Sequence, residues 1–193
     1  MIKKNLFIAL LLISSLHLSA QDYVIKATGD TIRGNILRLN KSMLKIQQLS
    51  GKSFKLYPRD VKEFRRDGAL FLSREIKYGK EPQFIGVEIE GKVNLLIIGG
   101  STPRMMSDER GGIKMIGADE RRTYYVEKNG AVTVLQDVIT DPFSGKKRLN
   151  EVRNLLLAVM GDDAEIAEKI NQTGFFGRWA VRKLVEDYNR KHQ

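Results

Sequence analysis

The chain has 193 residues, of which 42% are hydrophobic and 29% charged, a composition that is typical of a folded protein and excludes disorder as a description of the whole chain. It contains no cysteine, which excludes disulfides, thiolate metal sites, a cysteine nucleophile and the lipid anchor of a lipoprotein. Its 33 lysines and arginines exceed its 23 aspartates and glutamates, so the formal net charge is +10.

The first 20 residues are predicted to be a secretory signal peptide. Lys3 and Lys4 precede an apolar segment, and the segment ends with Ala20, a small residue that allows cleavage before Gln21. As a helix, the apolar stretch over residues 6–18 would reach only about 20 Å, whereas the hydrocarbon core of a bilayer is about 30 Å thick. We therefore expect an exported mature chain of residues 21–193, periplasmic or secreted, with no transmembrane span.

Residues 22–137 are predicted to form an antiparallel meander or a small barrel-like sheet. Short runs of β-branched and aromatic residues alternate there with turn residues, a pattern that is typical of hairpins. Asp67-Gly68 and Asn129-Gly130 are dipeptides that type I′ turns favour. The five predicted hairpins pair residues 23–27 with 31–37, 44–49 with 54–57, 64–66 with 69–72, 84–88 with 93–98, and 123–128 with 131–135. The glycine-rich stretch Gly99–Ala118, between the last two hairpins, is predicted to be a long loop with at most one irregular strand.

After Asp141-Pro142 the hydrophobic period changes from 2 to 3.6, which predicts three short helices within residues 146–191. The first ends near Gly161, and the second is capped by Asp162 or Asp163. The third runs from about residue 176 to 190, with Trp179 on its buried side. The expected fold class is therefore α+β, a single domain over residues 21–193 with a β-rich part (21–140) and a helical part (141–193).

Histidine is almost absent from the expected mature chain. His17 lies in the signal peptide, and His192 is the penultimate residue, where chain ends usually fray. We therefore expect neither imidazole nor thiol in the folded body, which excludes zinc hydrolases, Ser-His-Asp triads and Cys-His catalysis. Neither a cofactor nor a metal site is predicted.

Positive charge is concentrated near the start of the expected mature chain. Residues 21–80 contain 14 lysines and arginines against 6 acidic residues, whereas residues 81–193 contain 17 of each. A basic face of this kind would attract anionic envelope lipid or glycan. The alternative is a solvated sheet face whose lysines protect exposed edges. Nucleic acid is not favoured as a partner, because Tyr57 is the only obvious aromatic platform among the cations. The candidate anion-binding residues are Arg33, Arg38, Lys41, Lys45, Lys55, Arg59, Lys62, Arg65 and Arg66.

Two alternatives to a binding module remain open. Glu88 and Glu90 would lie about 6–7 Å apart on one face of a strand, a separation that suits a carboxylate-based glycan hydrolase of the inverting type. The apolar Val87 and Ile89 take the opposite face, so the two glutamates are expected to face water, where a general acid is not favoured. The second alternative is a carrier that holds a small molecule in an apolar cavity.

Several phrases of the sequence resemble uncharacterised exported proteins of Bacteroidota. They are the signal ending in Ser-Ala-Gln-Asp, the segments Gly29–Ile36 and Glu90–Leu95, Tyr124–Val126 with Asn129-Gly130, and the closing Leu184–Asn189. The resemblance implies a periplasmic or secreted location, hairpins followed by helices, and no assigned catalytic residue. We therefore expect an exported, non-enzymatic envelope protein that binds through a basic face.

Overall fold

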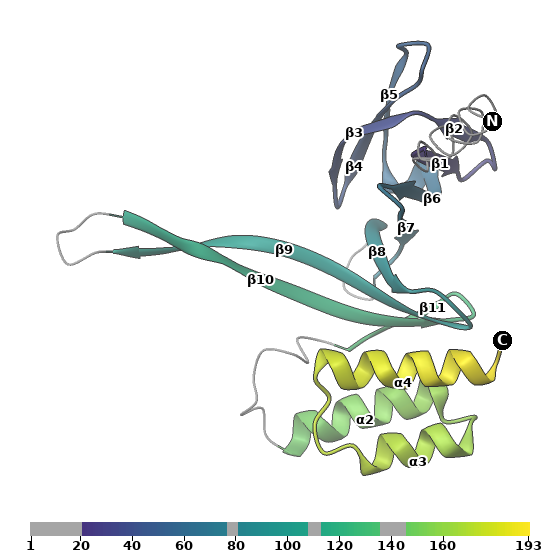
Figure 1. The fold of residues 1–193 in the computed structure, drawn as a ribbon, viewed down its shortest axis with the longest axis vertical. Coiled ribbons are helices and arrows are strands. Elements are labelled where there is room, and N and C mark those ends of the chain that lie inside the picture. The colour runs from purple at the N-terminus through teal and green to yellow at the C-terminus, as the bar shows by residue number, and fades with distance from the viewer. Residues whose placement is uncertain (1–20, 77–80, 108–112, 136–145) are drawn as a thin grey trace, which may run out of the picture. The chain divides into compact units, whose positions relative to one another are not determined.

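The computed structural model describes residues 21–76, 81–107, 113–135 and 146–193, and it is an α+β protein in which strands precede three helices (Figure 1). This confirms the predicted fold class. The chain divides into two compact units, residues 1–71 (unit 1) and residues 72–193 (unit 2). None of the helices in the described ranges is long and apolar enough to cross a bilayer.

The elements follow the predicted order of hairpins and helices. The strands are β1 (Tyr23–Lys26), β2 (Thr31–Arg33), β3 (Asn35–Asn40), β4 (Met43–Gln47), β5 (Ser53–Leu56), β6 (Val61–Arg66), β7 (Ala69–Arg74), β8 (Gln83–Ile89), β9 (Val93–Ser107), β10 (Ile113–Lys128) and β11 (Ala131–Val134). A short 3-10 helix, η2 (Pro58–Asp60), precedes β6, and the helices are α2 (Lys146–Met160), α3 (Ala164–Gln172) and α4 (Arg178–Lys191). Hydrogen bonding orders the strands as β11-β10-β9-β8-β7-β6-β1-β2 in one sheet and as β3-β4-β5 in another. Within the described residues, neither sheet closes into a barrel. Of the two predicted arrangements, the structure therefore shows the antiparallel meander and not the barrel-like sheet.

Unit 1 has an apolar row in each of its sheets. Val24 of β1 lies opposite Ile32 of β2 on one side and Phe64 of β6 on the other, and all three side chains are buried. In the second sheet, Leu44 of β4 lies opposite Leu56 of β5, and both are again buried. Because side chains alternate between the two faces of a strand, burial of these positions turns the residues between them outward.

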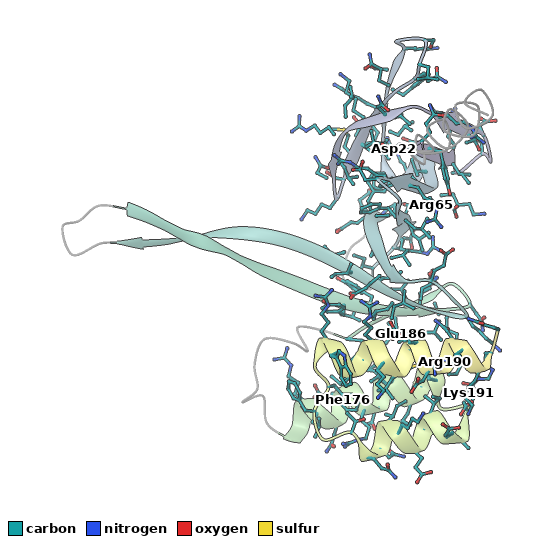
Figure 2. The ribbon with its side chains drawn as sticks, in the orientation of Figure 1. Asp22, Arg65, Phe176, Glu186, Arg190 and Lys191 are labelled. Atoms are coloured by element: carbon teal, nitrogen blue, oxygen red, sulfur yellow. The ribbon has the colours of Figure 1, made fainter. Side chains whose placement is uncertain are left out.

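Gly34 lies between β2, the last strand of the chain's first sheet to this point, and β3, the first strand of the three-stranded sheet. The sequence predicted one strand over residues 31–37, and this is wrong, because β2 ends at Arg33 and β3 begins at Asn35. A Cβ at Gly34 would lie 2.1 Å from the carbonyl oxygen of Gln47, so only glycine fits this close approach. Asp22 fixes the crossing, since its carboxylate accepts hydrogen bonds from the amides of Ile36 (3.0 Å) and Asp67 (2.9 Å; Figure 2).

Unit 2 is built around a long hairpin of β9 and β10. The predicted loop Gly99–Ala118 is wrong, because the two strands pair from Val93↔Lys128 as far as Ser107↔Ile113, with one irregularity after Met115. Residues 108–112, which fall within that predicted loop, lie outside the described residues. The pairing of a two-stranded ribbon needs only backbone groups, and an unpaired edge tolerates a proline such as Pro103. Composition therefore misled the prediction.

Helices α4 and α2 pack against the part of this hairpin near residues 93–97 and 123–128, and α3 packs against α2 and α4 (Figure 1). Leu95, Tyr124, Leu156 and Val185 are among the buried residues of this core. The prediction that Trp179 is buried is wrong, because its side chain is 73% exposed. Trp179 precedes the buried Val181 by two residues, which turns it about 200° around the helix from the core-facing stripe.

Asn189 of α4 forms hydrogen bonds with the backbone of Val93 at the start of β9. Its amide nitrogen donates to the carbonyl oxygen of Val93 (2.8 Å), and its amide oxygen accepts from the Val93 N–H (2.9 Å). Asn189 and Val93 are both buried. The side chain therefore pairs with the backbone as a neighbouring strand would, and it satisfies two groups that could not be left unpaired at low cost.

Candidate anion-binding face

Three of the predicted cations form a line across the second sheet of unit 1. Arg38 of β3 lies opposite Lys45 of β4, and Lys45 in turn lies opposite Lys55 of β5. Lys45 stands between the buried Leu44 and Ile46, so it points to the opposite, solvent face. Neighbouring strands lie about 4.8 Å apart. Arg38, Lys45 and Lys55, called the cation row from here on, thus form a compact line of positive charge.

Within the described part of the chain, no member of the cation row forms a salt bridge or a side-chain hydrogen bond. Like charges placed directly opposite one another weaken a sheet. The row therefore has an electrostatic cost that no counterion among the described residues offsets.

A second pair of predicted cations flanks Tyr23 in the first sheet. Tyr23 lies opposite Arg33 on β2 and opposite Arg65 on β6. Arg65 donates from Nε to the Tyr23 hydroxyl (3.3 Å) and from Nη1 to the carbonyl oxygen of Gly68 (3.3 Å; Figure 2). These contacts hold the Arg65 guanidinium in place, so it has a structural role beside any role in binding.

The structure does not bring the remaining predicted cations into the row. Lys41 lies in the β3–β4 turn and Lys62 near the start of β6, and both are exposed. Arg59 lies 4.0 Å from the carboxylate of Asp60, and Arg66 lies 3.4 Å from that of Asp67. Exposed pairs of this kind contribute little to stability, but they partly neutralise the two arginines.

Sequence reasoning missed the exposed apolar side chains of unit 1. Leu49 is 85% exposed in the turn between β4 and β5, and Leu37 is 50% exposed next to Arg38. Leu37 lies where the pairing of β3 with β4 shifts register between Ile36 and Arg38, so the irregularity turns two consecutive side chains outward. The signal for Leu49 was present, because the turn residues Ser50-Gly51 follow it directly.

Glu88 and Glu90 have different surroundings. Glu88 does not face water as predicted, because its side chain is only 9% exposed. Its Oε1 accepts hydrogen bonds from Arg178 (2.8 and 3.1 Å) and Arg182 (3.3 Å) of α4. Glu90 follows the end of β8 and is exposed, as expected. Helix α4 covers the face of β8 that carries Glu88, and sequence alternation alone cannot show such a cover.

His192 is part of the folded body, which corrects the prediction of a frayed end. Helix α4 continues to Lys191, and the His192 ring packs on the Tyr188 ring with 4.3 Å between centroids. His192 Nε2 lies 3.4 Å from a carboxylate oxygen of Asp163, but without hydrogen-bond geometry. The expected absence of imidazole from the compact part of the chain is therefore wrong.

Charge pairs next to His192 stabilise the α2–α3 junction. Lys128 donates from Nζ to the carbonyl oxygen of Val159 (2.9 Å) and to the carboxylate of Asp162 (2.8 Å), which also accepts from the Tyr188 hydroxyl. The hydrogen bond from Lys128 lowers the pKa of Asp162. Burial alone would lower the pKa of Lys128, but its interactions with Asp162 and Tyr188 outweigh that effect and raise it. Asp163 caps α3 through the Ile166 amide, and this bond, with that from Lys191, lowers the pKa of Asp163.

The described residues contain no group of three or more side chains that could hold a metal ion. Comparison with protein-family models, curated proteins and solved structures finds no match to this chain. The candidate site therefore rests on the geometry of unit 1.

Proposed function

We propose that the protein is exported and acts outside the cytoplasm as a non-enzymatic binding module. Its ligand is an anionic, phosphate-bearing lipid of the cell envelope, which it contacts through unit 1. The single observation that carries this proposal is the cation row, three like charges in cross-strand register with no acidic partner among the described residues.

The charge of unit 1 supports an anionic ligand. Residues 21–71 contain 11 lysines and arginines and 5 acidic residues, a net charge of +6, whereas residues 72–193 contain 20 and 18, a net charge of +2. The field of such a unit attracts anions over a distance of about a Debye length. Each basic residue close to an anionic lipid surface contributes about 1 kcal/mol.

The exposed leucines favour lipid over glycan. Leu49 projects from the β4–β5 turn, three residues before the exposed Lys52, and Leu37 adjoins Arg38 of the cation row. An apolar side chain beside cations can enter the boundary between headgroups and acyl chains, where burying a leucine contributes about 1.5–3 kcal/mol. An acidic glycan has no acyl-chain region in which an exposed leucine such as Leu49 could be buried.

Vesicle binding tests the proposal. We expect the mature protein to bind vesicles that contain phosphatidylglycerol and not vesicles of phosphatidylcholine alone. Binding should weaken steeply between about 0.1 M and 1 M salt, where the Debye length falls from about 10 Å to about 3 Å. Leu49→Ser should weaken binding to the anionic vesicles. If an acidic polysaccharide binds more tightly than the vesicles and Leu49→Ser changes neither, the lipid assignment is wrong.

The stability of unit 1 provides an independent readout. Replacing Lys45 by Thr removes the central charge of the row while keeping a residue that favours strands. If the row is maintained for binding at a cost in stability, this variant should unfold at higher denaturant concentration and bind anionic vesicles more weakly. If the face is only solvated and binds no ligand, the variant should gain stability with no change in its binding to anionic vesicles.

A further inference from the structure

Trp179 is the single tryptophan of the chain, and it borders two open grooves on unit 2. One runs along α4 and has a volume of about 680 Å³. The other lies between the end of α3 and α4 and has a volume of about 570 Å³. Both grooves are open to solvent, so a ligand there would be only partly enclosed. A 73% exposed indole in such a place offers a large apolar surface to a ligand.

Lys183 supplies a positive charge next to this indole. It lies one helical turn after Trp179, and its Nζ is 5.1 Å from the centroid of the Trp179 ring. Among the residues that the structure describes, no carboxylate forms a salt bridge with Lys183. The ammonium group is therefore positioned by the aromatic ring and has no anionic partner there.

The other charges of the α3–α4 groove largely balance one another. Asp187 accepts from Lys169 (3.2 Å) and from Arg190 (3.0 Å), and Lys169 also pairs with Glu165 (2.9 Å). The uncompensated charge therefore lies at Lys183, on the side of the groove that the indole forms. Figure 2 marks Arg190, farther along the same helix.

We propose that this groove binds an acidic sugar whose carboxylate pairs with the Lys183 ammonium and draws it away from the Trp179 ring, so that the pyranose ring stacks on the indole in its place. A pyranose ring has one face of C–H groups, which suits the indole, and a rim of hydroxyls, which suits the paired charges around Asp187. A carboxylate next to an ammonium forms a charge-assisted hydrogen bond. The proposal concerns α3 and α4 alone, so it is independent of lipid binding by unit 1.

Fluorescence of the single tryptophan tests the proposal at the site itself. We expect oligomers of galacturonate to change the emission of the full mature chain in a saturable way, and neutral galactose oligomers to bind roughly tenfold more weakly because they lack the charged bond. Lys183→Gln should remove the preference for the acidic oligomer. Lys45→Thr in unit 1 should leave the titration unchanged, which separates this site from the lipid-binding face.

Calorimetry with Trp179→Ala provides a second test, with Arg148→Gln as its control; the Trp179 side chain is exposed, so its loss should leave the fold intact. Heat of binding should be lost in this variant and retained in Arg148→Gln, a change on α2. The absence of saturable binding, equal affinity for neutral and acidic oligomers, or full binding by Lys183→Gln would each overturn the proposal. A tight protein partner captured through Trp179 without any sugar affinity would also overturn it.

Discussion

The contact between Asn189 and the backbone of Val93 yields the sharpest prediction about stability. Replacing Asn189 by Ala removes both hydrogen bonds and leaves the N–H and the C=O of Val93 without their partner in a buried position. A buried backbone group that loses its partner costs about 1–3 kcal/mol. Some relaxation is expected, so we predict that Asn189→Ala lowers the free energy of unfolding of unit 2 by about 2–4 kcal/mol.

Gly91 makes this prediction more specific, because a Cβ at this position would meet the same amide. A Cβ at Gly91 would lie 2.3 Å from Nδ2 of Asn189, and the φ angle of Gly91 is not positive. Gly91→Ala alone should therefore destabilise unit 2 by about 1–3 kcal/mol through overpacking. In the double variant the clash is gone, so the loss should be close to that of Asn189→Ala alone.

Urea unfolding followed by circular dichroism at 222 nm measures this cycle, because α2, α3 and α4 all lie in unit 2. We expect a coupling energy of about 1–3 kcal/mol between the two substitutions. If the double variant loses the sum of the two single losses to within about 0.5 kcal/mol, the residues act independently and the reasoning from this contact is refuted.

Three further predictions concern the core, the sheet crossing and pH. Leu156 is fully buried, so Leu156→Ala should cost about 2–5 kcal/mol in the same urea assay; a loss below about 1 kcal/mol would contradict its place in the core. Gly34→Ala should disrupt unit 1 selectively, because its Cβ meets the Gln47 carbonyl, and amide hydrogen exchange should rise in β3 and β4 while α4 stays protected. The pKa of Asp162 is lowered in the folded protein from its ordinary value of 3.8. As the pH falls through 3.8, the unfolded chain therefore binds a proton at Asp162 before the folded chain does. Unit 2 should thus lose stability in acid, and Asp162→Asn should show a shallower loss between about pH 5 and pH 2.

Features set by local chemistry could be predicted from the sequence. The Asp67-Gly68 and Asn129-Gly130 turns adopt positive φ at all four residues, as the dipeptides indicated. Asp163 caps α3 through the Ile166 amide, as one of the two predicted residues. In both cases the decisive interaction lies within three residues of the signal, so the pattern contains the required information.

Features set by distant segments could not be predicted. The break at Gly34 depends on the approach of Gln47, and the burial of Glu88 depends on the arginines of α4, 90 or more residues away. The cation row depends on the register shift between Ile36 and Arg38, which the alternation of residues does not reveal.

Two errors concerned features that local arguments could have found. The position of Trp179 relative to Val181 already placed it on the outer side of the helix. His192 follows Tyr188 by four residues, a spacing that allows the two rings to meet on one helix face.

The central claim is that the geometry of the cation row, and not net charge alone, binds anionic lipid. Two variants of equal charge test it most directly. Lys45→Gln with Lys55→Gln removes two members of the row, whereas Lys41→Gln with Lys62→Gln removes two exposed lysines outside it. Affinity for phosphatidylglycerol vesicles should fall roughly thirtyfold in the first variant, at about 1 kcal/mol per lysine, and less than about threefold in the second. Equal losses in the two variants would contradict the claim.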